Sequence, residues 1–224
     1  MFLGDSVSWS LATYLPEQDQ LEISVRGIQG CGIARLPEIR YVGLPHPNYP
    51  GCESWDTRWR WGVQAQDPDL AVILLDRWEL MDRKLGGHYR HVGEHDFDAY
   101  LDAELDRAID IAGSRGAHVV LLTAPYNRRA ERPDGGLWPE DEPERVDAWN
   151  RLLRAAADRH AATMIDLNQR ACPGGEFTWR AGGVRIRSDG LHFTPEGVRR
   201  WIAPWLLPQL ARLAVRGPAG PDGT

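Results

Sequence analysis

The amino-acid sequence predicts an α/β fold in which helices alternate with the strands of a mostly parallel sheet. The run 70–75 (LAVILL) is apolar throughout, which is typical of a strand buried on both faces. Between such runs lie longer segments with apolar residues at helical spacing, such as 96–115 and 144–160. Strands separated by helices favour right-handed crossovers and therefore a doubly wound sheet.

The predicted elements follow one another along the chain. We expect strands at 1–3, 21–25, 70–75, 118–123 and 163–167. We expect helices at 7–14, 96–115, 144–160 and from 195 to about Leu213, because Thr194 is a good N-cap and Pro195 suits the first helical position. The stretch 35–67 is rich in Pro, Gly and Trp and has no clear period, so no element is predicted there.

Length and composition indicate one domain. The chain has 224 residues, of which we assign 1–214 to a single domain and 215–224, rich in Gly and Pro, to a flexible tail. A net charge of −6 with scattered arginines argues against a nucleic-acid partner. The longest apolar run is too short to span a membrane, and no signal peptide is evident. We therefore expect a soluble, cytoplasmic chain, or an extracytoplasmic one if the sequence is an excised domain.

The chain has three cysteines, which are too few for a disulfide scaffold and match no zinc pattern. In the cytoplasm we expect Cys31, Cys52 and Cys172 to be reduced. Cys31 and Cys52 could pair in an oxidising compartment.

Two short motifs near the ends of the chain carry the chemistry. Gly4-Asp5-Ser6 follows the first strand, so the Ser6 hydroxyl is expected on a strand-to-helix turn, with its backbone N–H at a helix N-terminus. His192, just before the last helix, can act as the base, and Asp189 can hold its imidazole. The chain has no G-x-S-x-G elbow, which disfavours the α/β-hydrolase fold.

Together these motifs resemble those of the SGNH (GDSL-like) hydrolase superfamily, over nearly the whole chain. Gly4, Asp5 and Ser6 resemble the block that contains the nucleophile, and Gly30 resembles the glycine whose N–H serves the oxyanion hole. Asp189 and His192 resemble the last block of the triad. The resemblance implies a single-domain, three-layer α/β/α fold with a mostly parallel, five-stranded, flavodoxin-like sheet. It also implies a serine ester hydrolase or acyltransferase that needs no cofactor or metal.

The third block departs from the family pattern. The family places Gly-x-Asn-Asp after the strand that corresponds to 70–75, and the Asn donates to the oxyanion. This chain has Asp76, Arg77, Trp78 and Glu79 there, so Trp78 replaces the Asn. The replacement resembles SGNH domains associated with membrane acyltransferases that O-acetylate cell-surface sugars. The Trp78 indole N–H or the Arg77 guanidinium could supply the missing donor, or Trp78 could only pack.

Other residues are candidates for binding the substrate. Trp55, with Trp59 and Trp61, could form a stacking platform for a sugar, although core packing explains most tryptophans. Tyr126 and Asn127, followed by Arg128 and Arg129, come after a strand and could line the cleft or form a solvated loop. The histidines at 88, 91 and 95, with Glu94 and Asp96 nearby, are expected in a surface loop rather than a metal site.

The sequence therefore predicts an esterase or O-acyltransferase that forms an acyl-serine and acts on an acylated sugar or a small-molecule ester. The expected partner is that substrate; neither nucleic acid nor a membrane span is expected. The alternative is a non-catalytic binding module that reuses the fold. A third, narrower possibility is a tailoring enzyme that makes or transfers an ester in a small-molecule pathway.

Overall fold

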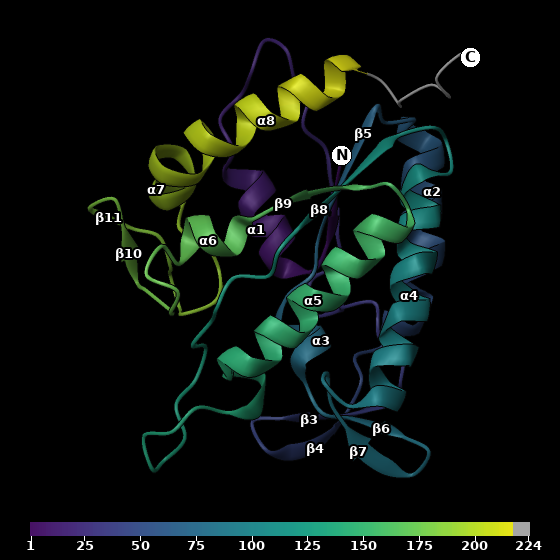
Figure 1. Ribbon diagram of the computed structural model, residues 1–224, viewed down its shortest axis with the longest axis vertical. Helices are drawn as coiled ribbons and strands as arrows, with labels where there is room; N and C mark the ends of the chain where they lie inside the picture. The colour runs from purple at the N-terminus through teal and green to yellow at the C-terminus, as the bar shows by residue number, and fades with distance from the viewer. Residues whose placement is uncertain (217–224) are drawn as a thin grey trace.

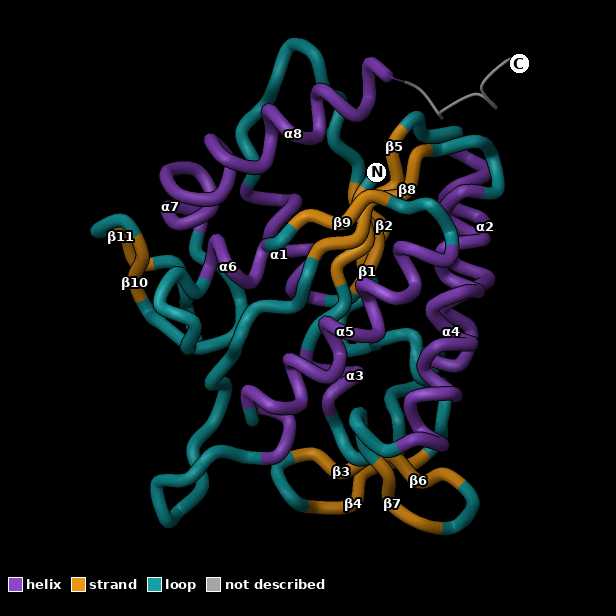
Figure 2. Tube along the Cα trace, viewed as in Figure 1, coloured by secondary structure: helices purple, strands orange, loops and turns teal. Residues whose placement is uncertain are grey.

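The computed structural model describes residues 1–216, which form three layers around a central sheet (Figures 1 and 2). This sheet has five parallel strands in the order β2-β1-β5-β8-β9. The strands are β1 (Phe2–Gly4), β2 (Val25–Gly27), β5 (Leu70–Leu74), β8 (His118–Leu122) and β9 (Thr163–Ile165). The predicted three-layer α/β/α fold with a five-stranded parallel sheet is confirmed. The second strand lies a few residues later than predicted.

Alternate residues of each strand face opposite layers of helices. One face packs against α1 (Ser6–Tyr14), α6 (Leu167–Ala171) and α8 (Ala203–Arg216) through residues such as Val72 and Val120. The other face packs against α2 (Trp55–Gln66), α4 (His95–Gly113) and α5 (Pro143–Arg159) through residues such as Ile73 and Leu121. In Figure 1, α2 and α4 lie on the right of the sheet, and α1, α6 and α8 on the left.

The order of the strands reverses at β1, since the chain passes from β1 to β2 and then back across to β5. In open α/β sheets, ligands bind outside the carboxyl ends of the strands at such a point. At the end of β1, Gly4 has a φ of +139°, and a Cβ there would lie 1.9 Å from the carbonyl oxygen of Leu74. Only glycine allows the turn into α1 to lie this close to β5.

A second, antiparallel sheet was not predicted. Its order is β4-β3-β6-β7. The strands are β3 (Glu38–Tyr41), β4 (Leu44–Pro47), β6 (Arg83–Leu85) and β7 (His88–Arg90). It lies at the lower end of the molecule in Figure 2, below the short helix α3 (Arg77–Leu80) that follows β5. The stretch 35–67 is thus largely regular, and also contains the 3-10 turn η1 (Cys52–Ser54) and α2.

The last helical segment begins as predicted, because the Thr194 hydroxyl accepts a hydrogen bond from Gly197 N–H. It consists of α7 (Pro195–Gly197), the π-helical turn η3 (Val198–Ile202) and α8, which runs to Arg216. Val215 and Arg216 therefore belong to this helix, whereas the rest of the predicted tail, 217–224, lies outside the described residues. Before this segment come the 3-10 turn η2 (Pro139–Asp141) and the hairpin of β10 (Arg180–Ala181) and β11 (Val184–Arg185).

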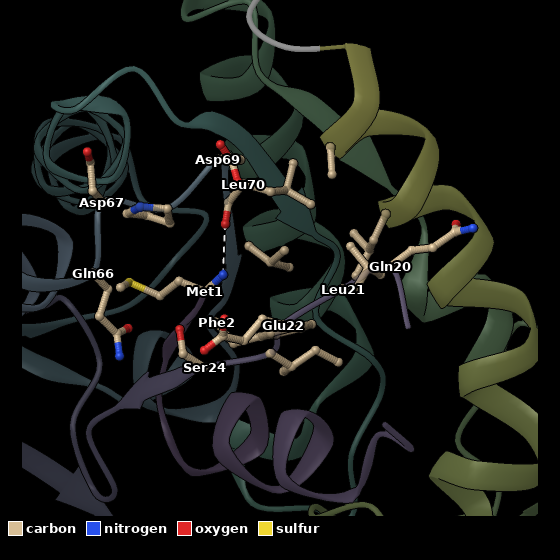
Figure 3. A pocket seen from close by; sticks show the side chains of 15 residues that line it. Met1, Phe2, Gln20, Leu21, Glu22, Ser24, Gln66, Asp67, Asp69 and Leu70 are labelled. Atoms are coloured by element: carbon tan, nitrogen blue, oxygen red, sulfur yellow. Dashed lines mark hydrogen bonds between the residues drawn. The ribbon is translucent and has the colours of Figure 1, made fainter. Parts of the chain in front are cut away.

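At the amino ends of the strands lies a hollow of about 360 Å³ (Figure 3). The Met1 ammonium group donates to the carbonyl of Leu70 at 2.8 Å, as the dashed line shows. Burial lowers the pKa of this amino group to about 6, against the opposing effect of Asp69. The hollow lies at the opposite end of β1 from Ser6. Within residues 1–216, no helix is both long enough and apolar enough to cross a membrane.

Candidate active site

Ser6, His192 and Asp189 form a continuous chain of short contacts at the carboxyl end of β1. Ser6 Oγ lies 2.8 Å from His192 Nε2, and Asp189 Oδ2 lies 2.8 Å from His192 Nδ1. A carboxylate beside Nδ1 favours the tautomer with its proton there, which leaves Nε2 free to accept the Ser6 proton. The structure thus brings together three residues that the sequence separates by up to 186 positions.

The Asp189 carboxylate is fixed by its own loop. Its Oδ1 accepts hydrogen bonds from the backbone N–H groups of Leu191 at 3.1 Å and His192 at 2.9 Å. Partial burial would raise the pKa of Asp189, but hydrogen bonds from the His192 ring and from these N–H groups hold it well below its usual range. Asp189 is therefore ionised at neutral pH and can stabilise an imidazolium.

Asp5, the N-cap of α1, fixes the position of Ser6. Asp5 Oδ1 accepts from the N–H of Val7 at 2.7 Å, and Oδ2 accepts from the N–H of Asp76 at 3.1 Å. These bonds fasten the start of α1 to the segment that follows β5. Since Ser6 is the first residue of α1, no earlier turn of the helix can satisfy its N–H. That N–H is available to a developing anion.

Three buried carboxyl groups lie at the start of α1 and in the segment after β5, and their burial was not predicted from the sequence. Burial raises the pKa of Asp5 to about 6, although three backbone N–H donors oppose it. Burial and the neighbouring Asp5 raise the pKa of Asp76 well above its usual range, and both Asp76 oxygens lack a partner within residues 1–216. Burial and Asp5 also raise the pKa of Glu79, to about 8, although Arg83 opposes this. Glu79 Oε1 accepts from Ile33 N–H at 2.6 Å.

Gly30, the second predicted oxyanion donor, lies beside two aromatic side chains. A Cβ placed on Gly30 would lie 4.0 Å from Trp78 Cζ2 and 3.9 Å from Tyr49 Cδ2. Trp78 and Tyr49 meet edge to face with their ring centroids 5.4 Å apart. Trp78 is partly exposed on α3. The residue that replaces the family's Asn therefore borders the Gly30 loop.

Arg77, the alternative donor, is directed elsewhere. It is only 2% exposed, its Nε lies 2.8 Å from Asp141 Oδ1, and its Nη2 lies 3.3 Å from Glu140 Oε1. A guanidinium held by two buried carboxylates would lose both partners by turning towards an oxyanion. The prediction that Arg77 could donate to the oxyanion is therefore wrong. Its acidic partners lie more than 60 positions away in the sequence, which gave no sign of them.

A disulfide joins Cys31, the residue after Gly30, to Cys52 at the start of η1. The expectation of three reduced thiols is thus wrong for this pair, and Cys172 is the one free thiol within residues 1–216. The bond ties the Gly30 loop to the turn that leads into α2. It limits the motion of this loop, which is also fixed near Ser6 by the hydrogen bond that Ile28 N–H donates to the carbonyl of Gly4.

The loop after β8 lies against the loop that carries Asp189. Arg128 N–H donates to the carbonyl of Gly190 at 2.9 Å, and a Cβ on Gly190, whose φ is +84°, would lie 1.9 Å from Arg128 O. Arg129 Nη1 donates to Asp189 Oδ2, the oxygen that also contacts His192. Arg129 thus contacts the Asp189 carboxylate directly, whereas the sequence predicted only that it could line the cleft or lie in a solvated loop.

Tyr126 and Asn127, the predicted substrate-binding residues on the same loop, make no hydrogen bond to Asp189 or His192 in the described part of the chain, and each has a different environment. The Tyr126 hydroxyl donates to Asp147 on α5 at 2.7 Å. Asn127 is 2% exposed, and neither polar atom of its amide has a partner among the residues that the structure describes. Asn127 is therefore a buried polar group beside the site rather than part of an open surface.

The family model for the SGNH domain (fused to AT3 domains) matches residues 1–206. The chain belongs to this family. No curated protein sequence matches the SGNH chain significantly.

Solved structures similar to this SGNH domain share its fold at low identity. A carbohydrate acetylesterase from Sinorhizobium meliloti is 17% identical, with a TM-score of 0.60 over 95% of this chain and 98% of that one. An acetyl xylan esterase is 16% identical, with a TM-score of 0.58 over 94% and 100%. A GDSL-like lipase from Bacteroides thetaiotaomicron is 18% identical, with a TM-score of 0.56 over 95% and 87%. At these identities the likeness shows the fold alone.

The tryptophans of the SGNH domain divide between core and surface. Trp55 and Trp59 are 1% and 2% exposed and pack edge to face within the core. Trp55 cannot stack on a ligand and is withdrawn as a substrate-binding residue. Trp61, on the same helix, is 64% exposed.

The histidines of the expected surface loop are dispersed. His88 lies in β7, the ring of His91 contacts the carbonyl of Val92, and His95 begins α4. Within residues 1–216, no group of three or more His, Cys, Asp or Glu side chains could hold a metal ion.

Proposed function

We propose that this SGNH domain is a serine esterase or O-acyltransferase that works through an acyl-serine. The main support is the position of Ser6 Oγ, 2.8 Å from the Nε2 of an imidazole whose Nδ1 contacts Asp189. In the first step Ser6 attacks the ester carbonyl while His192 takes its proton, and His192 then protonates the leaving alcohol. Water completes hydrolysis, whereas a sugar hydroxyl completes transfer.

The oxyanion of the tetrahedral intermediate would be stabilised by the backbone N–H groups of Ser6 and Gly30. We assign the third donor to Trp78 Nε1–H. The position of its ring against Gly30 supports this assignment, and the buried ion pairs of Arg77 argue against the rival donor. An indole N–H is a donor only, so it can stabilise an anion but cannot take its proton.

The proposed substrate is an O-acylated sugar. Two structural neighbours are named a carbohydrate acetylesterase and an acetyl xylan esterase, and the family model describes a domain fused to AT3 domains. These names favour small acyl groups on carbohydrate over other esters. A small-molecule ester remains the second substrate class of the proposal.

Residues 1–214 form the proposed catalytic domain. The disulfide between Cys31 and Cys52 supports an oxidising compartment, in place of the cytoplasm expected from the sequence, because cytosolic proteins keep their thiols reduced.

The test is covalent labelling with a fluorophosphonate together with turnover of 4-nitrophenyl acetate. Ser6→Ala should abolish both and leave the melting temperature nearly unchanged, because a surface hydroxyl adds little to packing. Ser114→Ala, which changes an exposed serine at the end of α4, is the matched control and should keep both. Absence of labelling in the folded wild-type protein would favour the alternative, a non-catalytic binding module.

A further inference from the structure

A groove of about 680 Å³ lies between β2 and α2, outside the triad (Figure 1 shows α2). One wall is the end of β2 and the loop after it, and the other is the exposed side of α2. The residues that line it are Val25, Arg26, Gly27, Ile28, Gln29, Thr57, Arg58 and Trp61.

The first wall of the groove continues into the catalytic centre. Gly27 pairs with Gly4, and a Cβ on Gly27 would lie 2.9 Å from the carbonyl oxygen of Asp5. Ile28 N–H donates to the carbonyl of Gly4 at 2.7 Å. Gln29 directly precedes Gly30. A chain-like ligand in the groove would thus lie beside the turn that carries the nucleophile.

The side chains of the groove combine one flat apolar surface with positive charge. Trp61 is 64% exposed, although two other tryptophans of α2 are buried. The Arg26 guanidinium lies 5.8 Å from the Trp61 ring centroid, and Arg58 is exposed one turn earlier on α2. Among the described residues, no Asp or Glu lines the groove, and the nearby Asp56 is already paired with Arg35 at 3.1 Å. The groove is therefore basic, on a chain whose net charge is −6.

We propose that this groove binds an acidic sugar unit of the acyl-bearing glycan. This inference rests on the proposed function, whose substrate class it narrows to glycans that contain uronic acid. An indole ring offers the apolar C–H face of a pyranose a flat surface. A guanidinium binds a carboxylate through two parallel, charge-assisted N–H···O bonds, which are stronger than its bonds to the neutral hydroxyl groups of a sugar. The two together select an acidic sugar over a neutral one.

The test is calorimetric titration of the whole protein with trigalacturonate and with the corresponding neutral galactose trimer. The wild type should bind the acidic trimer about tenfold more tightly than the neutral one, and the difference should shrink at high salt. Trp61→Ala should weaken binding of both trimers about tenfold, and Arg58→Gln should weaken only the acidic one, by about threefold to tenfold.

Trp179→Ala is the matched control. Trp179 is also exposed, at 41%, and has an arginine 5.3 Å from its ring, but it precedes the β10–β11 hairpin, which Figure 1 shows on the opposite side from α2. This variant should bind as the wild type does. Equal affinity of the wild type for the two trimers, or unchanged binding after Trp61→Ala, would overturn the proposal.

The two proposals fail separately, because neither trimer carries an ester and binding needs no turnover. A protein that binds trigalacturonate selectively but does not hydrolyse 4-nitrophenyl acetate would refute the esterase and keep the groove. A protein that hydrolyses the ester but shows no preference for the acidic trimer would refute the groove proposal and keep the esterase.

Discussion

Removal of the disulfide should reduce both stability and catalysis. Cys31 and Cys52 are 21 positions apart, and a cross-link that closes a loop of this size stabilises the folded state by about 3 kcal/mol through chain entropy. For a chain of this length, 1 kcal/mol corresponds to roughly 2–4 °C in melting temperature. The double variant Cys31→Ala/Cys52→Ala should therefore melt roughly 6–12 °C below the wild type.

The catalytic loss arises because Cys31 adjoins Gly30. Without the bond, the Gly30 N–H, a proposed oxyanion donor, would be held less firmly in place. Complete loss of one oxyanion donor typically costs about 10²–10³ in kcat. We expect a partial loss of about tenfold in kcat, with a smaller change in KM, because the oxyanion exists only near the transition state.

The assay compares melting curves and kcat of the wild type and the double variant, each with and without reductant. Reductant should lower the melting temperature of the wild type only. Cys172→Ala is the control, since Cys172 is a free buried thiol and its loss leaves the bond intact. The reasoning is refuted if the unfolded, unreduced wild type has three titratable thiols, or if the double variant melts with the wild type.

Three further predictions concern single residues. Trp78→Phe keeps a ring beside Tyr49 but removes the N–H, so kcat should fall by about 10- to 10³-fold with little change in melting temperature. An unchanged kcat would mean that Trp78 has only a structural role. Arg129→Gln removes a cation from the Asp189 carboxylate, which should then stabilise the imidazolium better. The acid limb of the kcat/KM profile should therefore move up by about half a pH unit, and Arg129→Lys should restore the wild-type profile. The raised pKa of Glu79, about 8, means that its neutral form stabilises the fold below about pH 4.5 and that this contribution is lost as the pH rises through 8. Glu79→Gln should therefore flatten the fall in melting temperature between about pH 4.5 and 8; parallel curves for the two proteins would exclude this role.

The parallel sheet was predictable because its three central strands, β1, β5 and β8, are almost entirely buried. Runs such as 70–75 are apolar throughout for that reason, and few other structures need such a run. The antiparallel sheet was not predictable, since its strands are short and polar, and β4 contains two prolines. Its two hairpins come from distant segments and meet at a single pair, Ile39 and Arg83. That pairing depends on the tertiary fold and not on any local pattern.

Helix α2 does have an apolar stripe in the sequence, although no element was predicted there. Trp55, Trp59 and Val63 follow one another at intervals of four and are all buried, as expected of a helix. The surrounding Pro and Gly residues, and the exposed Trp61 within the same segment, concealed this stripe.

The site was predictable only where the residues lie in local motifs. Ser6, Asp189 and His192 are identified by their neighbours in the sequence. The role of Arg77 was not, because its position is determined by Asp141, which is 64 positions away. The contact of Arg129 with Asp189 likewise spans 60 positions.

The distance of 186 positions between Ser6 and His192 has a consequence for synthesis of the protein. The ribosome makes Ser6, the proposed nucleophile, among the first residues of this domain and His192, its proposed base, after nearly all the others. A nascent chain that has folded β1, β5 and β8 would carry a serine without its base. On the proposed mechanism the domain gains its activity only when the loop that carries His192 closes, so a translation product that ends before this loop should not cleave esters.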